Sequence, residues 1–288
     1  MAESPSHRFG QIVGNFLEQL LLPILLEFCD ERRLYLDSHG DRVGVRVGRK
    51  VSWEDKYGNS HDLDFVIEKD GSLTAQGRPV AFIEAAWRRY TKHSRNKAQE
   101  IQGAVLPIAE KYQLEKPFLG AVLAGIFTAP SIAQLRSVGF EVVYLPYESV
   151  IAAFDAAGVD CRFNEDTSDR EFASCIRKIE TLTEKAQRKV IDRLFSANKA
   201  GFDAFFAALR IKLDRIVERI VVTPLFGDSM TFDTVKEAVK YIGDFKPSNG
   251  TGKFRKYEIA VAYSNGDQMQ GAFTDKDRAL EFLNYVLA

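Results

Sequence analysis

At 288 residues, with 45% hydrophobic and 27% charged residues, the chain has an ordinary globular composition and is long enough for one large domain and a smaller one. Its net charge of −1 excludes an overall basic field, so a surface that binds a polyanion must come from local segregation of charge. The beginning of the chain lacks the pattern of a secretion signal, and the longest apolar run is too short for a membrane span. These features predict a cytoplasmic protein without membrane contact.

The cysteines point in the same direction. Cys29, Cys161 and Cys175 are odd in number, far apart in the sequence and outside any CxxC spacing. This pattern argues against both a disulfide framework and a structural zinc site. It predicts free thiols in a reducing compartment.

The first third of the chain predicts a helix followed by strands. Apolar residues at helical spacing from Phe9 to Phe28 predict an amphipathic helix, interrupted or kinked near Pro23. Alternating valines in RVGVRVGRKVSW predict a strand, which the turn KYGNS connects to a second strand, DLDFVIE. The apolar run VAFIEAAW predicts a third strand, of the kind found at the centre of a covered sheet.

The pattern then alternates between helix and strand. A helix is predicted from Ser94, a plausible N-cap, to Tyr112, with a bend or division at Pro107. The segments FLGAVLAGIFT, APSIAQLRSVG and FEVVYLPY predict a strand, a short helix and another strand. This order predicts an α/β domain over residues 1–158, with a mixed central sheet flanked by helices.

The rest of the chain predicts two further parts. A polar turn and a long charged stretch predict a helical segment over residues 159–216. Residues 217–288 predict a small α+β module, with a flexible loop KPSNGTGK, a hairpin around Asn265-Gly266 and a last helix capped by Asp275.

Acidic residues at the ends of two predicted strands suggest a metal site. Asp62 and Asp64 alternate on one face of a strand, and Glu84 ends the next strand along the chain. An aspartate and a glutamate from a hairpin pair can converge as oxygen ligands for a hard cation, Mg²⁺ or alternatively Mn²⁺. Such an ion can polarise a phosphodiester and activate a bound water.

A basic run directly follows Glu84. Cationic side chains at a helix start oppose the helix dipole, so a phosphate backbone is the more economical reason for them. The residues predicted to bind DNA are Arg88, Arg89, Lys92, Arg95 and Lys97. Trp87 and Tyr90 lie among them and are interpreted as packing residues in preference to base-stacking ones.

The helix with an internal Glu18, Asp64 before Phe65-Val66-Ile67, and VAFIE ending at Glu84 resemble the PD-(D/E)xK nuclease superfamily over about residues 9–150. The resemblance implies a restriction-endonuclease-like core in which Asp64 and Glu84 bind the metal and Glu18 completes the site, with Asp62 as a neighbour that could contribute. With the chain length, it implies a type II restriction enzyme. Such an enzyme would cut double-stranded DNA as a homodimer, with residues 159–288 reading the sequence and a separate cognate DNA methyltransferase.

One position departs from the family pattern. The family's lysine belongs two residues after the acid, where this chain has Ala86. Either Lys97 or, less suitably, Arg88 supplies the charge, or Ala86 is an engineered change, or catalysis has been lost. The alternative functions are therefore a catalytically inactive nucleic-acid-binding protein on the same fold and a structure-specific DNA repair nuclease.

Overall fold

The structure is a computed structural model, and it describes residues 4–90, 94–164, 166–225, 227–246 and 254–287. The chain divides into two compact units, residues 1–209 and 210–288. Most of the stretch that the sequence analysis separated as residues 159–216 therefore belongs to the first unit.

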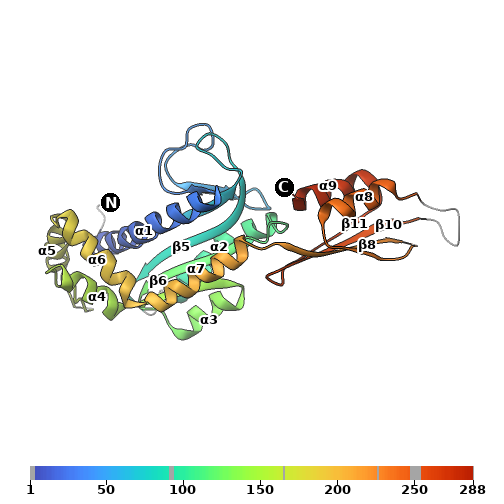
Figure 1. The fold of residues 1–288 in the computed structure, drawn as a ribbon. Coiled ribbons are helices and arrows are strands. Elements are labelled where there is room, and N and C mark those ends of the chain that lie inside the picture. The colour runs from blue at the N-terminus through green and yellow to red at the C-terminus, as the bar shows by residue number, and fades with distance from the viewer. Residues whose placement is uncertain (1–3, 91–93, 165, 226, 247–253, 288) are drawn as a thin grey trace. The chain divides into compact units, whose positions relative to one another are not determined.

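The first unit is built on a mixed five-stranded sheet. Figure 1 labels two of its strands, β5 and β6, with helices beside them. The strand order is β1-β4-β5-β6-β7, in which β1, β4 and β5 are antiparallel and β5, β6 and β7 are parallel. The strands are β1 (Tyr35–Asp37), β4 (Phe65–Lys69), β5 (Arg78–Arg88), β6 (Phe118–Gly125) and β7 (Phe140–Pro146). The predicted α/β class with a mixed central sheet flanked by helices is confirmed.

Helices pack on both faces of this sheet. They are α1 (Pro5–Arg32), α2 (Ser94–Lys111), α3 (Ala129–Ser137), α4 (Tyr147–Ala156), α5 (Asp169–Glu180), α6 (Glu184–Ala197) and α7 (Lys199–Leu213). On one face, Phe82 and Ala86 of β5 share a buried cluster with residues of α2 and α3. Because side chains alternate along a strand, Trp87 points to the other face, where its ring contacts Phe9 of α1.

Helix α1 runs without interruption through Pro23, so the predicted break is wrong, although the helix itself is confirmed. It begins after the N-cap Ser4 and ends where Arg33 adopts a left-handed conformation. Its length and composition would allow it to cross a membrane, but half of its most apolar stretch is buried within the protein. The helix packs against β5, α5 and α6.

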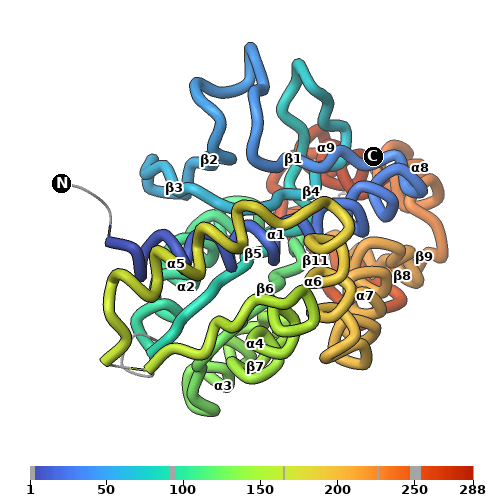
Figure 2. The backbone as a smooth tube through the Cα atoms, turned by 90° about the vertical axis from the view of Figure 1, so that its left-hand side faces the viewer, coloured from blue at the N-terminus to red at the C-terminus, as the bar shows by residue number. Residues whose placement is uncertain are grey.

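The valine-rich segment is mostly not a strand. Only β2 (Val51–Glu54) is extended there, and it pairs with β3 (Ser60–Leu63), while Val43 and Val47 are exposed. Tertiary contacts of Arg42 override the alternating pattern: its guanidinium is 1% exposed, donates to Glu68 Oε1 at 2.5 Å and also donates to the Ser72 carbonyl. The loops 38–50 and 70–77 consequently lie side by side (Figure 2).

Replacing Arg42 with Met should destabilise the first unit by about 3 kcal/mol, because the Glu68 carboxylate would stay buried without its counter-charge. Urea unfolding followed by circular dichroism measures this loss. Arg49→Met is the matched control, since Arg49 is an exposed arginine of the same loop. Equal stability of the two variants would contradict a structural role for the buried ion pair.

The second unit is an antiparallel sheet of order β11-β10-β8-β9 packed against two helices. Its elements are β8 (Val217–Leu225), β9 (Met230–Phe232), α8 (Val235–Asp244), β10 (Lys256–Tyr263), β11 (Gln268–Phe273) and α9 (Lys276–Leu287). The hairpin around Asn265-Gly266 is confirmed, and Asp275 caps α9 by accepting from the Arg278 N–H at 2.9 Å. Of the predicted loop KPSNGTGK, residues 247–253 lie outside the described residues.

Candidate functional site

The end of β4 brings two acidic side chains together. Phe65 of β4 pairs with Ile83 of β5, so the next residue outward on each strand is Asp64 and Glu84. The Asp64 backbone N–H donates to Glu84 Oε1 at 3.3 Å, and the Ala85 N–H donates to Asp64 Oδ2 at 2.7 Å. Hydrogen bonds from backbone N–H groups to these carboxylates thus replace the backbone pairing between the strands at Asp64, where β4 is connected to β3. The sequence prediction that these two carboxylates meet agrees with this geometry.

The site also includes Glu18 of α1. Burial, and then the charge of Asp64, raise the pKa of Glu18 to about 7. Burial, followed by the charge of Asp64, raises the pKa of Glu84 to about 8, and burial raises that of Asp64. The carboxyl groups of α1, β5 and the residue before β4 therefore form one electrostatically coupled group.

The chemistry of this group fits a hard cation. Carboxyl groups that lie near one another and have raised pKa values would be stabilised in their ionised form by a divalent ion. Among the described residues, however, no group of three or more His, Cys, Asp or Glu side chains is already arranged to hold a metal. Glu18, Asp64 and Glu84 are nevertheless a candidate ligand set, because their charges act on one another. Their side chains would have to rotate to bind one ion together.

Metal binding at these carboxyl groups should strengthen as the pH rises. Their raised pKa values mean that a cation must displace protons from Glu18 and Glu84 below about pH 8, whereas both groups are ionised at about pH 9. We expect the dissociation constant for Mn²⁺, measured by electron paramagnetic resonance, to fall at least about tenfold from pH 6 to pH 9. A pH-independent constant, or one unchanged by Glu84→Gln, would show that Mn²⁺ binds elsewhere.

Lys97 supplies the cationic partner of this site. It lies in the first turn of α2, and its positive charge opposes the rise in the pKa of both Asp64 and Glu84. Its Nζ atom is also 3.6 Å from Glu100 Oε2, an oxygen shared with Arg88 at 3.1 Å. Ala86, where the family lysine would stand, is 3% exposed and packs with residues of α2.

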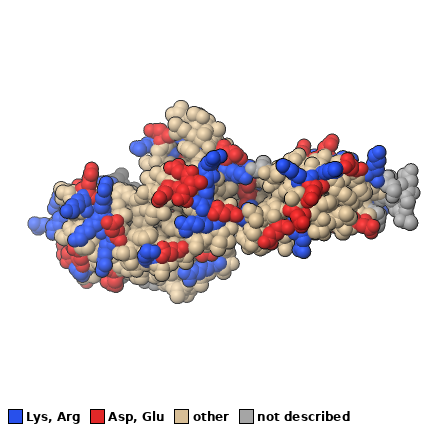
Figure 3. All heavy atoms as spheres, in the orientation of Figure 1, with Lys and Arg blue, Asp and Glu red and all other residues tan. Residues whose placement is uncertain are grey.

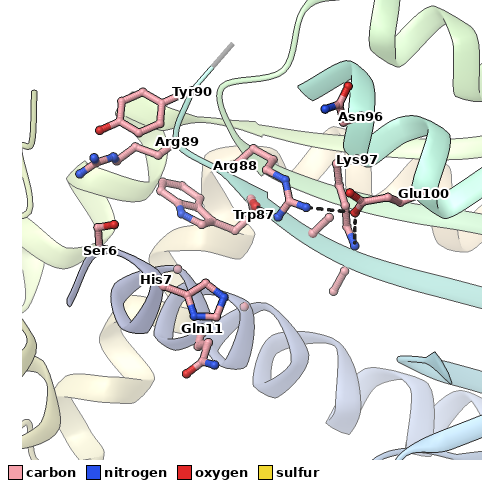
Figure 4. A pocket seen from close by; sticks show the side chains of 14 residues that line it. Ser6, His7, Gln11, Trp87, Arg88, Arg89, Tyr90, Asn96, Lys97 and Glu100 are labelled. Carbon is pink, nitrogen blue, oxygen red and sulfur yellow. Dashed lines mark hydrogen bonds and ion pairs between the residues drawn. The ribbon is translucent and has the colours of Figure 1, made fainter. Parts of the chain in front are cut away.

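A cleft of about 590 Å³ is lined by Lys97, Arg88 and Ala86 among others, and it begins next to the carboxyl groups, at Ala85, without being lined by them. Its walls are the start of α1, the last residues of β5 and the start of α2, as Figure 4 shows. His7, Gln11 and Gly14 line it and are spaced so that they share a helix face with Glu18. The helical spacing of positions 7, 11, 14 and 18 is the sequence signal that would have placed these residues in the site. A Cβ atom added at Gly14 would meet no atom within 4 Å, in keeping with open space there.

The predicted DNA-binding residues do not form one uniform patch. Arg88 pairs with Glu100, and Arg95 is exposed on α2, whereas Lys92 lies outside the described residues. The guanidinium of Arg89 stacks on the rings of Tyr90 and Phe172, at 4.2 and 4.5 Å. Burial lowers the pKa of Arg89, and its Nη1 atom has no hydrogen-bond partner among the described residues. Arg89 therefore combines a packing role with a position in the cleft wall.

Asp62 does not belong to the coupled set of Glu18, Asp64 and Glu84. It belongs to β3, not to the strand that follows Asp64, and it is exposed and paired with Lys50 at 2.6 Å. The predicted single strand through Asp62 and Asp64 is therefore wrong, because the bend at Asp64 separates β3 from β4. Because of this bend, the alternation of side chains along one strand does not place Asp62 and Asp64 on the same face.

Further basic side chains lie on helices that pack against α1. On the face seen in Figure 3, Lys and Arg side chains gather over α5 and α6, with acidic residues among them. The exposed cations of these helices are Arg170, Arg177, Lys178, Lys185, Arg188, Lys189 and Arg193. Exposed acidic residues lie on the same two helices, so the excess of positive charge there is small; they are Asp169, Glu171, Glu180, Glu184 and Asp192.

Comparison with known proteins gives little guidance. No protein-family model matches the chain, and no curated protein matches it. A solved structure described as a protein of unknown function, AF1548, is similar at 11% sequence identity over 67% of this chain and 98% of that one, with a TM-score of 0.29. The site has to be interpreted from its own geometry.

Proposed function

We propose that the protein is a metal-dependent endonuclease that hydrolyses DNA phosphodiester bonds. One observation carries the proposal: Asp64 and Glu84 meet at the end of an antiparallel strand pair, coupled to Glu18 and facing the charge of Lys97. Carboxyl groups whose pKa is raised by burial reduce the stability of the fold, and such groups are found preferentially at functional sites. A strand-end acid pair beside a partly basic cleft suits phosphodiester hydrolysis better than a structural role.

Each residue has a defined part in this proposal. Asp64 and Glu84 would hold Mg²⁺, or alternatively Mn²⁺, and Glu18 would complete the ligand set from α1. When bound, the ion would lower the pKa of a water molecule and polarise the phosphodiester. The charge of Lys97 opposes the rise in the pKa of Asp64 and Glu84, and its ammonium would orient an attacking water or a phosphate oxygen. The Ala85 N–H fixes Asp64 by donating to Oδ2.

The cleft and the helices beside it support DNA as the substrate. Arg88, Arg89 and Lys97 line the cleft, and the exposed cations of α5 and α6 add positive charge in the same unit. We propose a type II restriction enzyme of the PD-(D/E)xK kind, acting as a homodimer on duplex DNA. The second unit would read the sequence: a hollow of about 460 Å³ on its sheet is lined by residues of β8, β10 and β11, including Thr223, Glu258 and Gln270.

A DNA-binding protein without catalysis is the second candidate, and Ala86 is the observation that favours it. The position lies on the same strand face as Glu84, where an ammonium would reach the carboxyl groups directly. Its small side chain packs against α2. If Lys97 does not replace the missing charge, the same cleft would bind DNA and leave it intact.

Cleavage assays on supercoiled plasmid and genomic DNA with Mg²⁺ or Mn²⁺ test these functions. We expect discrete fragments, because a restriction enzyme cuts at fixed sequences. Cutting confined to branched or damaged DNA would replace the proposal with a structure-specific repair nuclease. Mobility shifts without cleavage of any substrate would support the binding protein and remove the enzymatic proposal.

A further inference from the structure

Two cysteines that are distant in the sequence meet in the first unit. Cys161 follows α4 and Cys175 lies in α5, and their Sγ atoms are 3.1 Å apart. The two residues are 0% and 5% exposed, and the third cysteine, Cys29, is buried in α1. The fold thus brings together two cysteines whose distance in the sequence argued against a disulfide.

We propose that Cys161 and Cys175 form a covalent modification site, at which a hydroperoxide converts the two thiols into a disulfide. The sulfurs of a disulfide are about 2.05 Å apart, so the Sγ atoms need to approach by only about 1 Å. A displacement of this size requires side-chain rotation and no rearrangement of the helices. The proposal is independent of the nuclease function.

The two thiols are chemically unequal, which assigns the order of reaction. The hydrogen bond between the two thiols, followed by the charge of Lys178, lowers the pKa of the Cys175 thiol in spite of its burial. The same interaction and burial raise the pKa of Cys161. Because the thiolate is the reactive form, Cys175 is the thiol that is oxidised first.

The reaction balances with one hydroperoxide. The Cys175 thiolate attacks one peroxide oxygen, the O–O bond breaks, and the released hydroxide takes a proton to become water. The Cys161 sulfur then attacks the sulfenic sulfur of Cys175, and its proton leaves with the sulfenic oxygen as a second water. The two thiols lose two electrons in total and the peroxide gains them. Hydrogen peroxide is small enough to reach a nearly buried thiol through a local opening.

The disulfide would restrict the movement of the segment between Cys161 and Cys175, which packs behind the wall of the cleft. Phe172 lies between the two cysteines in sequence, and its ring carries the Arg89 guanidinium. At the other end of the segment, Tyr147 Oη accepts from the Phe163 N–H at 3.0 Å, and the Tyr147 ring lies 5.9 Å from that of Trp87. Both Arg89 and Trp87 line the cleft. A disulfide would therefore restrict the opening of the wall behind these residues.

Alkylation followed by mass spectrometry tests the bond. After treatment with hydrogen peroxide and then with iodoacetamide in denaturant, the protein should carry one alkyl group where the reduced protein carries three. Trypsin should release a linked pair of peptides containing Cys161 and Cys175. Cys29→Ala should retain this link, and Cys161→Ser should lose it. Three alkyl groups after oxidation, or a link that involves Cys29, would overturn the proposal.

Amide hydrogen exchange tests the consequence. Exchange in residues 162–164 and 166–174 should be roughly tenfold slower or more in the oxidised protein, because a closed loop opens less often. The strands of the second unit serve as an internal reference, and Cys175→Ser should show no change on oxidation. If the bond forms but exchange in this segment stays the same, the bond does not support the cleft wall.

Discussion

Replacing Glu84 with Gln should reduce the rate of DNA cleavage by at least about a hundredfold while leaving duplex binding nearly unchanged. The substitution keeps the size of the side chain and removes the charge that would hold the metal. The amide oxygen can still accept from the Asp64 N–H, so the strand end should keep its shape. Single-turnover cleavage and fluorescence anisotropy in Ca²⁺ separate the two effects.

Asp62→Asn is the matched control for this experiment. Asp62 lies two residues before Asp64, carries the same charge and pairs with Lys50 on the surface. Its substitution should leave cleavage within about threefold of wild type, since an exposed ion pair contributes little. Equal losses in the two variants would indicate a general electrostatic effect on DNA. Full activity of Glu84→Gln would exclude the assigned site.

Local patterns predicted the elements of the sheet best where burial alone decides the structure. β5 and β6 are nearly continuous apolar runs at the centre of the sheet, and such runs are extended because both faces of a central strand are covered. β7 is the edge strand, and its buried residues alternate with more exposed ones. The helix predicted from Ser94 to Tyr112 runs from Ser94 to Lys111, and Pro107 does not divide it. Errors arose where distant contacts compete with local preference. The Arg42 interactions with Glu68 and Ser72 hold residues 42–50 as a loop, and alternating valines carry no sign of these partners.

The candidate site shows the same division. The meeting of Asp64 and Glu84 follows from the hairpin register, which pairs Phe65 with Ile83, although β5 does not end at Glu84 as predicted but continues to Arg88. The bend that separates Asp62 from Asp64 depends on the pairing of β3 with β2, and the pairing of Arg88 with Glu100 depends on how α2 approaches β5. These are tertiary relations. The contribution of the α1 face at His7, Gln11 and Gly14 was visible as helical spacing but had no chemical motif to mark it.

Position 86 lacks the family's lysine, so the protein is an endonuclease only if another cation replaces it, and otherwise a DNA-binding protein without catalysis. Lys97 is the residue proposed to replace it. Its charge acts on both Asp64 and Glu84, and the Lys97 side chain is 25% exposed in the cleft wall. Lys97→Ala should therefore lower the cleavage rate by about a hundredfold, with a much smaller loss of binding. Arg95→Ala is the control, because Arg95 is an exposed cation two residues earlier on the same helix.

The converse change tests whether position matters or charge alone. Ala86→Lys places an ammonium on the strand face of Glu84, in a spot that now packs against α2. If Lys97 has taken over the role, this substitution should lower activity in the wild-type background and partly restore it in Lys97→Ala, because the site needs one ammonium near the carboxyl groups and a second would compete with the metal. Increased cleavage in the wild-type background would instead mean that the function of position 86 has been lost. Unchanged cleavage by Lys97→Ala would remove Lys97 from the site altogether.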